Sequence, residues 1–196
     1  MKLFLATGNR DKIKEISAIL PFGKFSLETC LDHPDMPEVK EDGATLLENS
    51  EKKAMASASY FNMPAVADDT GLEVHALGGA PGVYSARWAG EGCTYLDNNL
   101  KLLKELEKFS DSERQARFVC VITLAFPEGK RVSFEGVTEG IIARKPTGTA
   151  GFGYDPLFFV PEFGLTYAEM GPELKNRISH RAKALAKLKE YLEDLE

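Results

Sequence analysis

The sequence predicts an α/β fold in one domain that spans residues 1–196. Short apolar runs typical of buried strands alternate along the chain with segments whose apolar residues recur at helical spacing. The chain of 196 residues is long enough to bury one sizeable core. Its composition, 43% hydrophobic and 28% charged with no Gly/Ser or Gln/Asn tract, is that of an ordered globular protein.

The first strand is predicted over residues 2–6 and the first helix over residues 11–20, where isoleucines recur every three residues. Thr-Gly-Asn-Arg connects them. A strand that turns through glycine into a helix directs backbone N–H groups at an anion. Lys12 stands in the first helical turn, where the helix dipole disfavours a cation. Two interpretations stay open, a bound anion and an Asn9 helix cap beside a solvated lysine.

A second helix is predicted over residues 44–61, because Thr45 and Glu48 have the spacing of a capping box. Its polar side chains recur every four residues and are Thr45, Asn49 and Lys53. The residues expected to face the core are Leu46, Leu47 and Ala54. The loop before this helix carries three carboxylates, each of which is either solvated charge or part of a site: Glu38, Glu41 and Asp42.

The densest chemical signal is the pair Asp68 and Asp69, which follows a short apolar strand over residues 65–67. We expect a turn after the pair and another strand over residues 72–76. Carboxylates at the carboxyl end of a strand lie where α/β folds bind ligands. Because adjacent residues of an extended chain point to opposite sides, one aspartate can face a site while the other braces the turn. Such carboxylates suit Mg²⁺ when phosphates complete its octahedron, and an acidic turn without a ligand is the alternative.

The middle of the chain is interpreted mainly as scaffold. Residues 78–90 form a loop rich in glycine and proline that serves as a lid, a subunit contact or a turn. A hairpin is predicted over residues 116–143 and an amphipathic helix over residues 94–109. The residues expected on the core face of that helix are Leu96, Leu100, Leu103 and Leu106.

Residues 148–156, GTAGFGYDP, are interpreted as a nucleobase pocket. Their glycines do not follow the G-x-G-x-x-G spacing, and they lead into extended chain instead of a helix, which argues against a phosphate cradle. Glycines beside Phe152 let the backbone approach a ligand while the ring offers a face. Stacking of a base on such a face contributes about 1–3 kcal/mol.

The last helix is predicted to begin at Ser179, whose hydroxyl is expected to cap it. This start places His180 and Arg181 in the first turn, where they add donors and positive charge to a helix end that already attracts anions. Lys175 precedes them and is grouped with them. The residues expected to face inward are Leu185, Leu188 and Leu192.

The overall charge and hydropathy exclude several classes of partner. A formal net charge of −6 argues against a broad nucleic-acid surface, although a small anionic ligand is allowed. The apolar stretch over residues 118–126 is too short for a membrane-spanning helix, and residues 3–6 are too short for a signal-peptide core. We expect a soluble, cytoplasmic protein that binds no nucleic acid and no membrane.

Six segments, in their order and spacing, resemble the inosine triphosphate pyrophosphatase family, the RdgB-like XTP/dITP pyrophosphatases that remove non-standard purine nucleotides. The segments are ATGNRDKIKEI, ENSEKKA, ADDTGLEV, GGAPGVYSAR, GTAGFGYDPLF and ISHRAKAL. The resemblance implies a long mixed β-sheet flanked by helices, with a central nucleotide cleft between two lobes. It also implies an Mg²⁺-dependent homodimer that hydrolyses ITP, dITP and XTP to the nucleoside monophosphate and pyrophosphate.

The same resemblance assigns roles to individual residues. Asp69 would be the general base and a metal ligand, and the second metal ligand aligns with Glu41, which we favour slightly, or with Glu38. The phosphates would be bound by Thr7, Gly8, Asn9, Arg10, Asp11, Lys12 and Lys53. The remaining substrate contacts would be Thr70, Phe152, Gly153, Tyr154, Asp155, Lys175, His180 and Arg181. The sequence departs from the family at Thr70 and Ser50, where serine and alanine are common.

Two other functions stay open. A pyrophosphatase of the related Maf type would act on modified pyrimidine nucleotides, but Phe152 with His180 and Arg181 favours a purine, because donors here suit the C6 oxygen of hypoxanthine or xanthine. A non-catalytic nucleotide sensor would keep the stacking ring and the phosphate turn. It would not require Asp69 with Mg²⁺.

Overall fold

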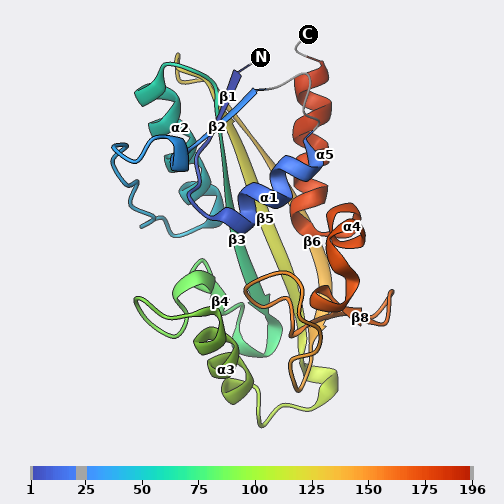
Figure 1. The fold of residues 1–196 in the computed structure, drawn as a ribbon. Helices are drawn as coiled ribbons and strands as arrows, with labels where there is room; N and C mark the ends of the chain where they lie inside the picture. Colours follow the sequence, from blue (N-terminus) through green and yellow to red (C-terminus); the bar gives the residue numbers. More distant parts are fainter. Residues whose placement is uncertain (1, 21–25, 195–196) are drawn as a thin grey trace. The chain divides into compact units, whose positions relative to one another are not determined.

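The structure, a computed structural model, describes residues 2–20 and 26–194 (Figure 1). Its helices are α1 (Arg10–Ile19), α2 (Leu46–Phe61), α3 (Tyr95–Glu105), α4 (Tyr167–Ile178) and α5 (His180–Glu193). Its strands are β1 (Lys2–Leu5), β2 (Ser26–Thr29), β3 (Ala65–Val74), β4 (Pro81–Gly82), β5 (Gln115–Ala125), β6 (Arg131–Ile142), β7 (Phe158–Val160) and β8 (Leu165–Thr166). No helix within the described ranges is long and apolar enough to cross a bilayer.

Within the described residues, eight strands form one mixed sheet in the order β2-β1-β3-β5-β6-β7-β8, with β4 paired to β3. β1 runs parallel to β2 and to β3, whereas β4 is antiparallel to β3. β7 is antiparallel to both β6 and β8. The predicted α/β fold, a mixed sheet flanked by helices, is therefore confirmed.

The chain divides into two compact units built from interleaved segments. Unit 1 contains Met1–Asp69, Cys120–Gly136 and His180–Glu196, and unit 2 contains Thr70–Val119 and Val137–Ser179. The three longest strands, β3, β5 and β6, contribute residues to both units. A single domain over residues 1–196 and a cleft between two lobes stay predictions.

Alternation along β1 divides the apolar side chains of unit 1 between two cores. Leu3 and Leu5 pack with apolar residues of α1 and α5. Phe4 and Ala6 point the other way and pack with alanines of α2. Accordingly, α1 and α5 cover one face of this part of the sheet and α2 the other (Figure 1). The buried leucines of α5 are those predicted, Leu185, Leu188 and Leu192.

The acidic pair lies inside a strand, so the predicted turn between two strands is wrong. β3 continues through Asp68 and Asp69 to Val74. Its pairing with β1 ends at Val66, opposite Leu5, so both aspartates come just after the end of β1. Alternation sends the two carboxylates to opposite faces, where each finds cationic partners, and neither has to leave the strand.

Two predicted core faces are partly wrong. In α3, Leu96 and Leu100 are 61% and 56% exposed, whereas Leu102 and the C-cap residue Leu106 are buried. Leu96 and Leu100 point outward because the face that the helix buries also carries Asn98 and Asn99, whose amides donate to loop carbonyl oxygens. In α2, Leu46 and Ala54 are buried as predicted but Leu47 is exposed.

The later elements follow the prediction more closely. β5 and β6 are neighbours joined by a short turn in which the Phe126 N–H donates to Lys130 O, which confirms the hairpin. α5 begins at His180, directly after Ser179, as expected. Ser179 also ends a separate helix, α4, which is interrupted at Gly171 where φ is 71°.

Gly136 of β6 allows the first turn of α5 to approach the sheet within unit 1. A Cβ at this position would lie 2.5 Å from the Ala184 nitrogen and closer still to the His180 carbonyl oxygen. We expect Gly136→Ala to lower the free energy of unfolding by about 1–3 kcal/mol, since overpacking forces the backbone to shift. Urea denaturation measures the change, with Gly8→Ala as the control because its Cβ meets nothing within 4 Å. Equal stability of the two variants would contradict this account.

Candidate functional site

The turn after β1 is held by Asn9, the N-cap of α1. Its Oδ1 accepts from the backbone N–H of Asp11 at 2.9 Å and of Lys12 at 3.2 Å. The Asn9 N–H donates to Thr7 Oγ1 at 3.2 Å. Of the two open interpretations, the structure contains the Asn9 cap, which engages two N–H groups that an anion at this helix end would use. The lysine is not solvated, since its Nζ lies 3.1 Å from Asp68 Oδ2 and its side chain is only 17% exposed.

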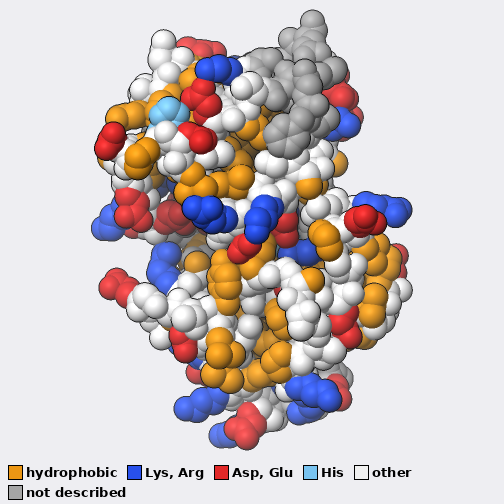
Figure 2. Space-filling view, in the orientation of Figure 1, with side chains coloured by type: hydrophobic (Ala, Val, Ile, Leu, Met, Phe, Trp, Pro, Cys, Tyr) orange, Lys and Arg blue, Asp and Glu red, His pale blue; other side chains and the backbone are white. Residues whose placement is uncertain are grey.

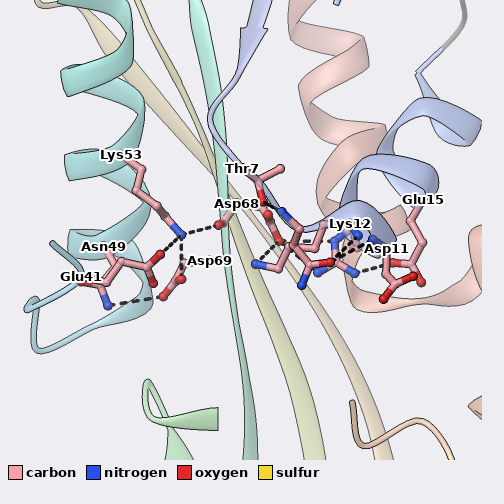
Figure 3. Close-up of polar contacts among 11 residues, drawn as sticks. Thr7, Asp11, Lys12, Glu15, Glu41, Asn49, Lys53, Asp68 and Asp69 are labelled. Carbon is pink, nitrogen blue, oxygen red and sulfur yellow. Dashed lines mark hydrogen bonds and ion pairs between the residues drawn. The ribbon is translucent and has the colours of Figure 1, made fainter. Parts of the chain in front are cut away.

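Asp68 is fully buried and lies among cations on the α1 and α5 side of β3 (Figure 3). Arg181 donates to its Oδ2 from Nη2 at 3.0 Å and from Nε at 3.3 Å. The same guanidinium donates to Glu15 from Nη1. Burial alone would raise the pKa of Asp68, but the charges of Lys12, Arg181 and Lys53 outweigh it and hold that pKa well below its usual range.

Asp69 faces the α2 side of β3, where Lys53 is its closest cation (Figure 3). Lys53 Nζ lies 3.0 Å from Asp69 Oδ1, 3.1 Å from Glu41 Oε1 and 2.8 Å from the carbonyl oxygen of Asp68. Burial raises the pKa of Asp69; Lys53 and Lys12 oppose the rise, and the carboxylate of Glu41 adds to it. Two carboxylates therefore share one ammonium group.

The carboxylates of Asp69 and Glu41 fit a hard divalent cation. Both are oxygen donors beside the same Nζ, and Mg²⁺ commonly binds through one or two carboxylates with substrate phosphates. Within the described ranges, no three His, Cys, Asp or Glu side chains are grouped to hold a metal ion. Glu38 is exposed, and the structure brings Glu41 to Asp69 instead. Metal binding itself stays a prediction.

In unit 2, Asp155 braces the predicted base-binding segment. Its Oδ2 accepts from the Phe152 N–H at 2.8 Å and from Lys175 Nζ. Gly151 has a φ of 76°, and a Cβ there would collide with the Asp155 carboxylate. Lys175 Nζ also lies 4.8 Å from the centroid of the half-buried Phe152 ring, within cation–π range. One carboxylate thus orders both the turn and the lysine beneath the ring.

Two further bonds attach this segment to the rest of unit 2. The buried Tyr154 hydroxyl donates to the carbonyl oxygen of Ser85 at 3.0 Å, and burial raises the pKa of this phenol. Asn99 Nδ2 donates to the carbonyl oxygen of Gly153 at 3.0 Å. Tyr154 is thus an anchor of the segment, a role that residue type alone did not indicate.

The predicted site residues fall into both units. Unit 1 holds Thr7, Gly8, Asn9, Arg10, Asp11, Lys12, Glu38, Glu41, Lys53, Asp69, His180 and Arg181. Unit 2 holds Thr70, Phe152, Gly153, Tyr154, Asp155 and Lys175. Arg10 is exposed, His180 is buried, and the buried guanidinium of Arg181 is directed at carboxylates. The base contact predicted for Arg181 stays a prediction, whereas the structure shows it as an ion-pair partner.

Sequence reasoning missed two contributors to unit 1. Glu15 is the second carboxylate at Arg181, and nothing local marks it, because its partner is 166 residues away. Asn49 was placed on the polar stripe of α2 without a role, and its amide contacts Asp69. The four-residue spacing from Asn49 to Lys53 was the available signal, since both side chains point to the same face.

The fold and these clusters are typical of α/β proteins that bind phosphorylated ligands: a mixed sheet with carboxylates and lysines gathered where a strand ends.

The chain belongs to the Ham1 family, which matches residues 3–191. It is 53% identical to the dITP/XTP pyrophosphatase of Geobacter sulfurreducens over 97% of this chain and 96% of that protein. The Ham1 protein of Staphylococcus aureus superposes with a TM-score of 0.90 at 38% identity and full coverage of both chains. A HAM1 protein from Coxiella burnetii gives 0.90 at 40% identity, covering 99% of each chain. The predicted resemblance is confirmed.

Proposed function

We propose that this protein hydrolyses dITP, ITP and XTP to the corresponding nucleoside monophosphate and pyrophosphate, with Mg²⁺ as cofactor. Family membership and relatives at about half identity over nearly the full length make the chain a nucleoside triphosphate pyrophosphatase. The observation that carries the finer proposal is the grouping of Asp69 and Glu41 around Lys53. Homodimer formation, a cytoplasmic location and the absence of nucleic-acid partners stay predictions.

Asp69 is proposed to orient or deprotonate the water that attacks the α-phosphorus. Its pKa is raised by burial, which makes it a stronger base than an exposed aspartate. A divalent cation at Asp69 and Glu41 would neutralise charge on the triphosphate and on the leaving pyrophosphate. Lys53 and Lys12 add positive charge on either face of β3. Because both lysines pair with carboxylates in this structure, a triphosphate would compete for them.

The cluster of Phe152, Asp155 and Lys175 in unit 2 suits a flat ring instead of phosphates. Phe152 lies in a turn ordered by Asp155, and Lys175 lies against the same aromatic ring. Such a turn offers an aromatic face and backbone groups at a defined position, which favours a base with hydrogen-bonding edges. On the face drawn in Figure 2, acidic and basic side chains are interspersed, and no single sign of charge dominates it.

The function is tested by measuring pyrophosphate release from ITP, dITP, XTP, ATP, GTP and modified pyrimidine triphosphates, with and without EDTA. The proposal expects fast release from the first three and loss of release with EDTA. Preference for modified pyrimidines would favour the Maf-type activity. Binding of ITP without turnover would favour a sensor.

The two candidate metal carboxylates are separated by a pair of amide variants. We expect Glu41→Gln to raise the Mg²⁺ concentration for half-maximal turnover by about 10-fold or more, since it removes one of two anionic ligands. Glu38→Gln is expected to leave that concentration unchanged, because Glu38 is exposed. Magnesium titrations of pyrophosphate release at fixed ITP measure both. The reverse order would assign the ligand to Glu38.

A further inference from the structure

Asn49 of α2 links the loop that carries Glu41 to the strand that carries Asp69 (Figure 3). Its side chain is fully buried. Its Oδ1 accepts from the Gly43 N–H at 2.8 Å. Its Nδ2 points to Asp69 Oδ2 at 3.5 Å, a long and weak contact compared with the usual N–H···O distance of about 2.9 Å. One buried amide thus contacts both sides of the candidate metal site.

The loop end at Gly43 is closely fitted to the first turns of α2. A Cβ on Gly43 would lie 2.7 Å from Asn49 Oδ1 and 2.8 Å from Glu48 Cβ. The adjacent Ala44 N–H donates to Glu48 Oε2 at 2.6 Å. Glu41 precedes Gly43 by two residues, so this attachment determines where its carboxylate can lie.

Asp69 is held through both carboxylate oxygens. Oδ1 faces Lys53, which also contacts Glu41, and Oδ2 faces the amide of Asn49. Two carboxylates at one site repel each other, so their approach requires partners that hold them in place. The ammonium group of Lys53 supplies the positive charge that offsets this repulsion. The amide of Asn49 favours one orientation of the Asp69 carboxylate, because hydrogen bonds are directional.

We propose that Asn49 is a positioning residue that orients the carboxylates of Glu41 and Asp69 toward a shared divalent cation. The inference rests on the proposed metal-dependent function and adds a residue that does not itself bind the ion. Partners of this kind commonly change metal affinity by about 10–100-fold. An amide that only stabilises the fold would not act through Glu41.

A double-mutant cycle tests this inference by Mn²⁺ binding to the full chain without nucleotide, measured from the spectroscopic signal of free Mn²⁺. We expect Asn49→Ala and Glu41→Gln each to weaken Mn²⁺ binding by about 10-fold or more. The double variant should lose less Mn²⁺ affinity than the product of the two single losses, because the part of the Asn49 effect that acts through Glu41 is absent once Glu41 is replaced, whereas the part that acts through Asp69 persists. Multiplicative losses would overturn the inference.

Gly43→Ala disturbs the same contact from the other side, and it should reproduce the loss of Mn²⁺ affinity even where Asn49→Ala fails to fold. Asn98→Ala is the matched control, because Asn98 is also buried and clamps a loop: Oδ1 accepts from the Ala89 N–H at 2.7 Å and Nδ2 donates to Ala86 O at 3.2 Å. This control should lose stability but keep its Mn²⁺ affinity.

Equal Mn²⁺ losses in Asn98→Ala and Gly43→Ala would overturn the inference, as would unchanged affinity in Gly43→Ala. Wild-type protein that binds no Mn²⁺ would also overturn it. The substrate panel is independent of this measurement, because it tests pyrophosphate release from nucleotides. Failure of the inference can therefore be told apart from failure of the proposed function.

Discussion

Asp69→Asn is expected to lower pyrophosphate release from ITP by about 10³-fold or more, while ITP binding persists. The amide keeps the size of the side chain but loses the charge that a cation requires and the basicity that a water requires. Lys53 keeps its bond to the carbonyl oxygen of Asp68, so it remains in place. Steady-state release and calorimetric binding of ITP measure the two effects.

Asp42→Asn is the matched control for the loss of a carboxylate. Asp42 lies beside Glu41 in the sequence, is exposed, and pairs with Lys52 and Lys40 at the surface. Its replacement is expected to leave turnover within about two-fold, because exposed ion pairs contribute little. If Asp69→Asn weakens ITP binding by the same factor as turnover, the carboxylate contributes only to substrate binding, and its proposed role as a base is wrong.

Arg181→Leu is expected to lower the free energy of unfolding by about 3–5 kcal/mol, a large fraction of the stability of a typical domain. The substitution removes the guanidinium that contacts Asp68 and leaves this carboxylate fully buried with less compensating positive charge. Urea denaturation measures the loss. Arg117→Leu is the control, since its pair with Glu73 is exposed and contributes at most about 1 kcal/mol.

The same variant decides between two roles for Arg181. As an ion-pair partner, Arg181 influences turnover through the fold, so ITP and ATP release should fall by the same factor and their ratio should stay unchanged. As a donor to the C6 oxygen, it would instead lower ITP release selectively. A stable Arg181→Leu protein with a selective loss of ITP release would restore the base contact predicted from sequence.

The sequence predicted most of the local order in the fold, because that order depends on neighbouring residues. The cap at Asn9, the helix start at His180 and the opposed aspartates follow from capping rules and strand alternation. The length of β3 did not follow, since an Asp-Asp-Thr-Gly run has the composition of a turn. Its partners in the strand are distant in the sequence: the neighbouring strand β5 and the cations that pair with each carboxylate.

The long-range partners in the site lay beyond sequence reasoning for the same reason. Asp68 and Arg181 are 113 residues apart, and Asp155 and Lys175 are separated by 20 residues and a helix start. The exposed Leu96 of α3 is a different kind of error, because here the sequence predicted burial that the structure does not show. Helical spacing predicts an apolar face, but the buried asparagines determine the orientation of the helix. Periodicity identifies a helix and its pattern; it does not identify which neighbour covers it.

The placement of adjacent aspartates on opposite faces of β3 has a consequence for variant libraries of this gene. Neighbouring codons are under different selection: changes at Asp68 should deplete protein abundance, whereas changes at Asp69 should leave abundant but inactive protein. A one-residue deletion upstream within the strand would exchange the faces and fail in both assays. Abundance and activity scores would therefore diverge at the codon for Asp69 and coincide at the codon for Asp68.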